Sequence, residues 1–358
     1  MSYTGAGVDY GAMDPFKRVA IRAAGNTDAN AKGLGYRAVE WSRGESCFLL
    51  EGVDHYLAHV EEGLGSKNVI ADQIEWGYER IGQDAVAMIV NDMITLGALP
   101  ISLAMHLAVG NGKWFRNKKC VEDLIGGWRR GCDLAGAVWS GGETPTLRDI
   151  VYADGSVISG SAMGIIDPKS RVIRPRIAQG DAIIFLSSTG VHANGITLAR
   201  DIADKIKGGY DARVGKMTYG AALLAATPIY VPVIRRCLDA HVPIHYAAHI
   251  TGHGWRKLMR ATEPFVYVIE KLPTLLPIFE FIMAHGPIAK REMYATYNMG
   301  AGFAIYVPSV SAAKVIAIAG TLGFEAMRAG YIEKRGREKK VIIEPDHIEF
   351  EGSTLGVR

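Results

Sequence analysis

The hydrophobic and polar positions of the chain follow two periods, one typical of strands and one of helices. In residues 46–53 and 55–63, short runs rich in branched and aromatic side chains predict two strands. In residues 73–97, apolar residues recur every three or four positions and predict a helix that ends at Gly97. The same criteria predict a helix over 118–136 and strands over 100–110, 137–147 and 156–167.

A polar, proline-bearing stretch, residues 168–181, separates two halves of the chain. Beyond it the pattern predicts strands over 182–190, 264–270 and 298–308 and two further strands that close the chain. It predicts helices over 193–207, 219–240, 275–286 and 311–323 and one that begins at Trp255, after a loop over 247–254. We therefore predict an α+β or α/β protein with an N-terminal domain over 1–170 and an α/β domain over 171–358. The first 46 residues are glycine-rich and weakly periodic, which predicts a partly mobile segment.

The composition narrows the class of protein. The chain has 358 residues, enough for about two domains, and 40 Lys and Arg against 37 Asp and Glu leave a net charge of +3. No basic run is long enough to indicate nucleic-acid binding, and no apolar stretch predicts a membrane span. The four cysteines form no CxxC pair, which argues against a zinc site and favours a reducing compartment. We expect a cytoplasmic protein.

The stretch HVEEGLGSKN, residues 59–68, is the first candidate for chemistry. Gly63 and Gly65 let the backbone turn with its amides exposed, and such amides can hold an anion. Ser66 and Lys67 could add contacts to phosphate, whereas Glu62 would repel it unless a divalent cation lay between them. A plain glycine turn remains the alternative, because short glycine motifs often match by chance.

Asp92 falls on the apolar face of the predicted helix 73–97, beside Met88 and Leu96. A carboxylate there is costly unless it is paired or bound to a metal. One interpretation is a Mg²⁺ ligand, since Mg²⁺ takes few carboxylates together with nucleotide phosphates. Glu143, after two glycines at the end of a predicted strand, has the same two interpretations, a ligand over a cleft or a solvated residue of a turn.

Two further glycine-rich turns each run into a predicted helix. In SSTGVHANGITLAR, His192 lies in the turn and Asn194 and Gly195 open the helix, where free amides attract anions. In HITGHGWRKLMR, Arg256 and Lys257 lie near a helix start, where cations suit a site only if an anion arrives. The alternatives are a capping cluster and a solvated basic face. Together these loops predict a nucleotide and metal site between two domains.

Several motifs, taken in their order along the chain, resemble a known family. These motifs are SYTGAGVD, NDMITLGALP, GGETPTL, GVHANG, HITGHG and EMYATYNMGAGF, and they resemble those of aminoimidazole ribonucleotide synthetase, the phosphoribosylformylglycinamidine cyclo-ligase of purine biosynthesis. This family shares an ATP-binding superfamily with selenophosphate synthetase and thiamine-monophosphate kinase. The resemblance implies a homodimer in which the N-terminal sheets of two copies pair into a barrel. It also implies a C-terminal α/β domain, with ATP in the cleft between the two domains.

The resemblance also implies a reaction and its residues. ATP with Mg²⁺ would close the ring of formylglycinamidine ribonucleotide, a ligase reaction on a small-molecule substrate. Lys67, Asp92 and His192 would be catalytic, and Glu62, Asp92 and Glu143 would hold the metal. The implied ATP contacts are Gly63, Gly65, Ser66, Lys67, Asn91, Asp92, Gly142, Glu143, Thr144, His192, Asn194 and Gly195. The implied substrate contacts are Thr251, Gly252, His253, Gly254, Arg256, Thr296 and Asn298.

Three residues depart from the family pattern, which has Asp at Glu62, Gly at His253 and Arg at Ala295. The last departure leads us to expect that Arg256 and Lys257 hold the substrate phosphate instead. Two other classes stay open, a related ATP-using enzyme and a nucleotide-binding dimer without turnover. Against the first, no cysteine precedes Cys47, whereas selenophosphate synthetases carry a reactive Cys or selenocysteine near the N-terminus.

Overall fold

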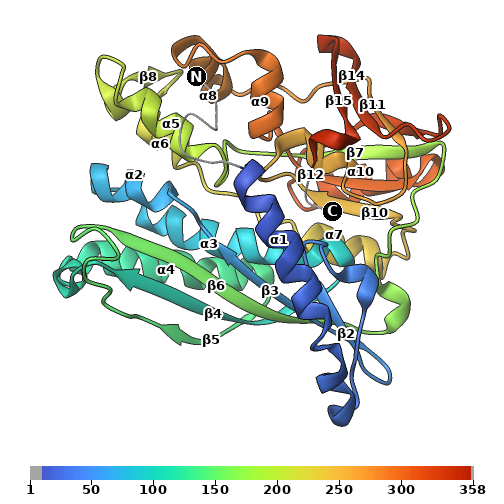
Figure 1. Cartoon of the computed structure of the whole chain (residues 1–358). Helices are drawn as coiled ribbons and strands as arrows, with labels where there is room; N and C mark the ends of the chain where they lie inside the picture. Colours follow the sequence, from blue (N-terminus) through green and yellow to red (C-terminus); the bar gives the residue numbers. More distant parts are fainter. Residues whose placement is uncertain (1–9, 356–358) are drawn as a thin grey trace.

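The structure is a computed structural model and describes residues 10–355. Its two halves each contain one large sheet (Figure 1). The motif SYTGAGVD, residues 2–9, lies outside the described residues. Within them, no helix combines the length and the apolar character needed to cross a lipid bilayer.

The first sheet has six strands, and helices cover one of its faces (Figure 1). All neighbouring strands are antiparallel except the last pair, which is parallel. In spatial order the strands are β1 (Arg37–Ala38), β2 (Phe48–Glu51), β3 (Tyr56–Gly63), β6 (Ser156–Ile166), β4 (Leu99–Val109) and β5 (Val138–Glu143). The helices of this half are α2 (Lys67–Ile74), α3 (Tyr78–Met93) and α4 (Lys118–Ala135). Along β6 buried and accessible positions alternate, as expected for a sheet with one covered face.

The second sheet has seven strands, mostly antiparallel. In spatial order they are β10 (Tyr246–His249), β12 (Ala301–Pro308), β7 (Asp181–Ser187), β13 (Ala326–Glu333), β11 (Val266–Ile269), β14 (Lys340–Ile343) and β15 (Ile348–Glu351). Its α-helices are α5 (Ile196–Ala203), α6 (Tyr219–Leu223), α7 (Val231–Asp239), α8 (Pro277–His285), α9 (Lys290–Thr296) and α10 (Ala312–Thr321). The central strand β7 is buried along almost its whole length, which explains its continuous apolar sequence. The mixed α+β fold in two halves is therefore confirmed.

Two predicted helices are broken in the structure. The helix expected over 73–97 is divided between α2 and α3, because Glu75 and Gly77 adopt positive φ angles of 50° and 89°. The helix expected over 219–240 is divided into α6 and α7 by the segment 224–230, which contains Pro228. The segment after Trp255 is a 3₁₀ helix, η8 (Gly254–Met259), and part of the expected loop 247–254 is strand β10.

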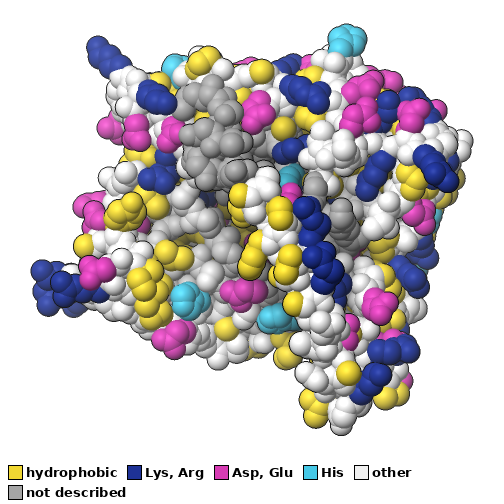
Figure 2. All heavy atoms as spheres, viewed as in Figure 1, with side chains coloured by type: hydrophobic (Ala, Val, Ile, Leu, Met, Phe, Trp, Pro, Cys, Tyr) yellow, Lys and Arg dark blue, Asp and Glu magenta, His cyan; other side chains and the backbone are white. Residues whose placement is uncertain are grey.

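The described part of the weakly periodic N-terminal segment contains regular helices. Helix α1 (Tyr10–Gly25) and the 3₁₀ helix η2 (Asp28–Leu34) occupy it, and α1 lies across the front of the molecule (Figure 1). Met13, Phe16 and Val19 of α1 remain exposed, and hydrophobic and basic side chains lie next to one another along this helix (Figure 2).

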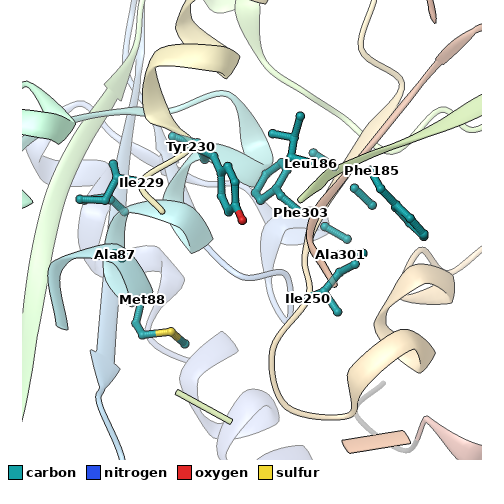
Figure 3. Close-up of a cluster of buried hydrophobic side chains, with 14 of the residues drawn as sticks. Ala87, Met88, Phe185, Leu186, Ile229, Tyr230, Ile250, Ala301 and Phe303 are labelled. Carbon is teal, nitrogen blue, oxygen red and sulfur yellow. The ribbon is translucent and has the colours of Figure 1, made fainter. Parts of the chain in front are cut away.

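The two halves share one hydrophobic core. Figure 3 draws Ala87 and Met88 of α3 in the same buried hydrophobic cluster as Ile229 and Tyr230, which precede α7. The ring of Tyr230 continues the contact into the second sheet, 5.5 Å between centroids from Phe303. This continuous packing fixes α3, and with it Asp92, against the second sheet.

Candidate active site

A cavity of about 620 Å³ lies between the two halves and collects most of the sequence-predicted loops. Its wall comes from the end of β3, the turn before α2, one face of α3, the turn before α5, the loop after β10, and η8. The lining side chains and glycines are Lys17, Glu45, Ser46, Glu61, Glu62, Gly63, Leu64, Gly65, Ser66, Met88, Asp92, Ala193, Asn194, Ile196, Thr197, Thr251, Gly252, His253, Lys257 and Arg260.

Glu62 and Asp92 meet at the floor of this cavity although they belong to different elements. Burial, then the charge of Asp92 and a hydrogen bond with it, raises the pKa of Glu62 to about 8. Burial also disfavours the charge of Asp92, but Lys257, His249 and Arg260 outweigh it and lower the pKa of Asp92 to about 2. At neutral pH the pair therefore carries one proton, on Glu62, and one negative charge, on Asp92.

His249 holds Asp92 from the second half of the molecule. Its Nδ1 lies 2.7 Å from Oδ1 of Asp92, and its side chain is fully buried. Burial lowers the pKa of His249, so the ring is neutral at neutral pH and donates its Nδ1 proton to the carboxylate. Sequence reasoning missed His249, although it is the first histidine of the HITGHG motif.

Three cationic side chains lie opposite the carboxylates. Lys257 donates to the hydroxyl of Thr251, and burial, the largest influence, lowers its pKa. Arg260 donates to the hydroxyl of Ser46 and to the carbonyl of Gly44, at 2.7 and 2.8 Å. Lys17 of α1 reaches the same cavity. Sequence reasoning named Lys257 but missed Arg260, and it missed Lys17, which lies in the weakly periodic N-terminal segment.

Lys67 does not reach the cavity. Its ammonium is fully buried, 2.6 Å from Oδ2 of Asp84, and it donates to the carbonyl of Ala225 at 2.9 Å. Asp84 in turn accepts the backbone N–H of Thr227. The structure thus places Lys67 in an ion pair that joins α2 and α3 to segment 225–227, and we withdraw its assignment as a phosphate ligand and catalytic residue.

Other predicted ATP contacts also have structural partners. Asn91 donates to the carbonyl of Pro228 and accepts the N–H of Tyr230, both at 2.9 Å, so it fixes the segment before α7. Gly195 has a φ of 71°, and a Cβ there would lie 2.2 Å from the ring of Tyr297. Asn91 and Gly195 are therefore engaged in packing and do not line the cavity. Gly63, Gly65, Ser66 and Asn194 do line it, as expected.

His192 lies just behind the cavity wall. It is fully buried, and within residues 10–355 neither ring nitrogen has a hydrogen-bond partner. Burial, then the charges of His249 and Lys67, holds the pKa of His192 well below its usual value, so the ring is neutral. His192 therefore does not line the cavity that contains Glu62 and Asp92.

The GGET segment lies away from the cavity. Gly142 and Glu143 end β5, the edge strand of the first sheet, and Glu143 and Thr144 are largely exposed. A Cβ on Gly142 would lie 2.0 Å from the carbonyl of Met105, which explains this glycine by close packing. Among the described residues no group of three or more acidic, histidine or cysteine side chains could hold a metal ion, so the expected trio of Glu62, Asp92 and Glu143 is not assembled within this chain.

The predicted substrate contacts divide in the same way. Thr251, Gly252 and His253 line the cavity, and burial, followed by Arg256 and Lys257, lowers the pKa of His253 to about 3. His253 is therefore neutral and adds no positive charge to the cavity.

Arg256, Gly254, Thr296 and Asn298 instead stabilise the loop from behind. The guanidinium of Arg256 donates to the carbonyls of His253, Ala295 and Thr354. A Cβ on Gly254 would lie 2.1 Å from the carbonyl of Tyr294, and Asn298 bonds Ser188, Gly190 and Gly300. Thr296 is buried beside Glu292. The expectation that Arg256 holds the substrate phosphate is corrected, because its donors are directed to the main chain.

Comparison with known proteins identifies the family. Residues 44–166 match the N-terminal domain model of AIR synthase related proteins, and residues 178–343 match the C-terminal domain model. The chain belongs to the AIR synthase family. It is 35% identical over 289 residues to the phosphoribosylformylglycinamidine cyclo-ligase of Methanocaldococcus jannaschii, covering 78% of this chain and 79% of that one. It is 32% identical to the enzyme of the same name from Pyrococcus furiosus, over 98% of this chain and 99% of that one.

Solved structures of two other proteins share the fold. AaThiL, solved with AMPPCP and TMP, aligns with a TM-score of 0.58 at 15% identity, over 91% of this chain and 94% of its own. PurL of T. maritima, solved with FGAR, also aligns with a TM-score of 0.58, at 13% identity, over 85% of this chain and 46% of its own. At these identities the likeness concerns the fold alone.

Proposed function

We propose that this AIR synthase family member catalyses ATP-dependent ring closure of formylglycinamidine ribonucleotide to aminoimidazole ribonucleotide, releasing ADP and phosphate. The observation that carries the proposal is one cavity between the two halves in which Glu62 and Asp92 face Lys257 and Arg260. Carboxylates for a metal and cations for phosphate are both needed to bring a triphosphate and a ribonucleotide phosphate together. The names of the relatives support the same reaction.

Magnesium fits this cavity with two protein ligands. Mg²⁺ commonly takes one or two carboxylates and completes its shell with water and nucleotide phosphates, so Glu62 and Asp92 suffice. His249 would orient Asp92 in the way that hydrogen-bonded partners orient metal ligands. The bound cation would neutralise the charge of the transferring phosphoryl group.

The bond changes follow from the two substrates. The γ-phosphoryl group passes to the formyl amide oxygen, which makes that oxygen a leaving group and releases ADP. The amidine nitrogen then attacks the same carbon, the C–O bond breaks with release of phosphate, and the nitrogen loses a proton. The chain contributes positioning and charge neutralisation. Lys257, Arg260 and Lys17 offset the negative charge of the phosphate groups, and the buried floor at Asp92 excludes water.

The state of the protein in the cell is part of the proposal. The face of the first sheet that α3 and α4 leave uncovered carries exposed Val157 and Met163 of β6, and we assign it to pairing with a second copy. Gly142, Glu143 and Thr144 lie on this sheet, so a role for them in ATP binding requires that second copy. We place the domain boundary at residues 170 and 171 and the homodimer in the cytoplasm.

Incubation of the purified protein with ATP, Mg²⁺ and formylglycinamidine ribonucleotide tests the proposal. Aminoimidazole ribonucleotide should form in equal amounts with ADP and only when all three are present. Hydrolysis of ATP without the ring product would assign the protein to another ATP-using reaction. Nucleotide binding with neither product would assign it to a binding role.

A further inference from the structure

A second cavity, which we call the α1 cavity, lies at the C-terminal end of α1. It has a volume of about 790 Å³. Its wall comes from the end of α1, η2, β1, the 3₁₀ helix η3 (Glu40–Ser42), β2, β3 and Arg174 in the segment that follows β6. No residue of this wall also lines the candidate active site, so the α1 cavity is a separate space.

Two cations of the α1 cavity have no carboxylate partner among residues 10–355. Arg174 is exposed, and its Cζ lies 5.6 Å from the centroid of the Trp41 ring. A guanidinium held on an aromatic face keeps its N–H edge for an oxyanion, which it can bind through two parallel hydrogen bonds. Lys32 of η2 is also exposed and adds a second positive charge to the same wall.

The carboxylates of Asp28 and Glu51 in this wall are already neutralised. Asp28 accepts from Arg43, and Glu51 pairs with Arg37 at 2.5 Å and with Lys169 at 3.0 Å. They therefore do not offset the charges of the two unpaired cations. The α1 cavity favours a ligand with a negatively charged group.

Other lining residues narrow the class of this ligand. Trp41 and the half-buried Tyr56 offer aromatic surface, on which a flat ring can pack. Glu40 is exposed and makes no ion pair within the described chain, and a carboxylate in a nucleotide site commonly bonds the ribose hydroxyls. A volume of about 790 Å³ lies within the range of about 300–1,000 Å³ that holds one small molecule. Phosphate, ribose and a flat base in one molecule of that size make a mononucleotide.

Helix α1 connects the α1 cavity to the candidate active site (Figure 1). Lys17 lines the candidate active site and Gly25 lines the α1 cavity, roughly 12 Å apart along the helix axis because each residue adds about 1.5 Å. Among residues 11–25 only Asp14 is buried, so few apolar contacts hold the helix. An element with so few contacts is easily shifted by a ligand at one end.

We propose that the α1 cavity is an effector site for a mononucleotide, whose phosphate binds Arg174 and Lys32 and whose base packs against Trp41 and Tyr56. A ligand that contacts the end of α1 fixes the helix and thereby holds Lys17 in the candidate active site. The effect on catalysis rests on the proposed function, whereas binding in the α1 cavity does not.

Calorimetry with AMP as the probe tests the site. The full chain is first saturated with AMPPCP and Mg²⁺, so that AMP does not enter the candidate active site. Arg174→Ala should weaken AMP at least tenfold, because the phosphate loses a charge-assisted hydrogen bond. Arg213→Ala is the matched control, since Arg213 of β8 (Arg213–Val214) is exposed and lines neither cavity.

Two calorimetric outcomes would overturn the inference. One is equal AMP affinity in native protein and Arg174→Ala, or no binding of AMP to either. The other concerns inorganic phosphate, which should bind at least tenfold more weakly than AMP because it has no base to pack on the aromatic rings. Equal affinities for phosphate and AMP would show a general anion site.

Steady-state kinetics at saturating ATP tests the link through α1. AMP should lower the KM for the ribonucleotide roughly fivefold in native protein, the scale of a modest coupling between two sites. Arg174→Ala should match native protein without AMP and show no response to it. Lys17→Ala should bind AMP normally, yet its KM should not change with AMP.

AMP that binds without changing any KM would overturn the effector role. If the protein forms no aminoimidazole ribonucleotide at all, the proposed function fails. The calorimetric difference between native protein and Arg174→Ala still decides in that case whether the α1 cavity binds a mononucleotide.

Discussion

A buried hydrogen bond of 2.7 Å between His249 and Asp92 crosses from one half of the molecule to the other. Asp92 is the penultimate residue of α3, which packs on the first sheet, and His249 ends β10 at the edge of the second. The bond orients the carboxylate and lowers its pKa, while Lys257 on the other side adds to the same effect. We infer that the geometry of the metal site depends on how the second half docks onto the first.

His249→Ala should reduce turnover about 10- to 100-fold and raise the Mg²⁺ concentration needed for half-maximal rate, the scale found when a partner of a metal ligand is removed. The rate is measured against Mg²⁺ concentration. His245→Ala is the matched control, because Nδ1 of His245 lies 2.8 Å from Oδ2 of Asp181 and neither residue lines the cavity. An unchanged Mg²⁺ dependence in His249→Ala would contradict the role of this bond.

Lys67→Ala should unfold more easily than the native protein rather than lose only ATP use. The substitution leaves the carboxylate of Asp84 fully buried without its ion-pair partner, and such a loss costs about 3–5 kcal/mol. The Tm and the denaturant midpoint measure it. Lys119→Ala, which removes the exposed partner of Asp123, should leave both unchanged. A stable Lys67→Ala protein with raised KM for ATP would restore the original phosphate interpretation.

Glu62 makes the metal-free protein less stable as the pH rises. Its pKa is about 8 in the folded chain against an ordinary 4.5, so between these values the unfolded chain has lost the proton and the folded chain keeps it. The unfolded state then binds fewer protons, and stability falls from about pH 4.5 to about pH 8. Glu62→Gln removes this penalty, so its Tm advantage over native protein in EDTA should grow across that window and stay constant above it. A constant difference from pH 5 to pH 9 would contradict the raised pKa.

Lys257→Ala should raise the KM for the ribonucleotide by roughly 10- to 100-fold, since a charge-assisted hydrogen bond contributes about 1.5–3 kcal/mol. Steady-state kinetics with each substrate varied in turn separates this effect from ATP binding. Arg256→Ala is the comparison, because its guanidinium bonds three main-chain carbonyls and its loss should lower Tm. Equal KM values in Lys257→Ala and native protein would remove Lys257 from the phosphate site.

The sequence predicted the mixed fold and most strands, because the second sheet is built from apolar runs such as β7 and β12 that have no other stable placement. It did not predict the break between α6 and α7. The side chains of Gln83 and Asn91 on α3 bond the backbone of Thr227, Pro228 and Tyr230, and these long-range partners stabilise an extended segment inside a helical pattern.

The sequence predicted which loops form the candidate site, but not always which residues of those loops reach it. Glu62, Asp92 and Thr251 reach the cavity because each lies where its element ends at the boundary between the halves. Lys67 follows the same glycine turn, yet its side chain turns to Asp84, a partner 17 residues away on another helix. His249 was missed because its pairing with Asp92 spans 157 residues, and no local pattern reports such a contact.

The most direct test of the central claim follows one oxygen atom. Formylglycinamidine ribonucleotide labelled with ¹⁸O at the formyl oxygen is converted with ATP and Mg²⁺, and the released phosphate is analysed by mass spectrometry. Our account predicts one ¹⁸O atom in each phosphate formed, in proportion to aminoimidazole ribonucleotide, because the phosphoryl group leaves with that oxygen. Label found in water while unlabelled phosphate is released, or phosphate formed without the ring product, would contradict it.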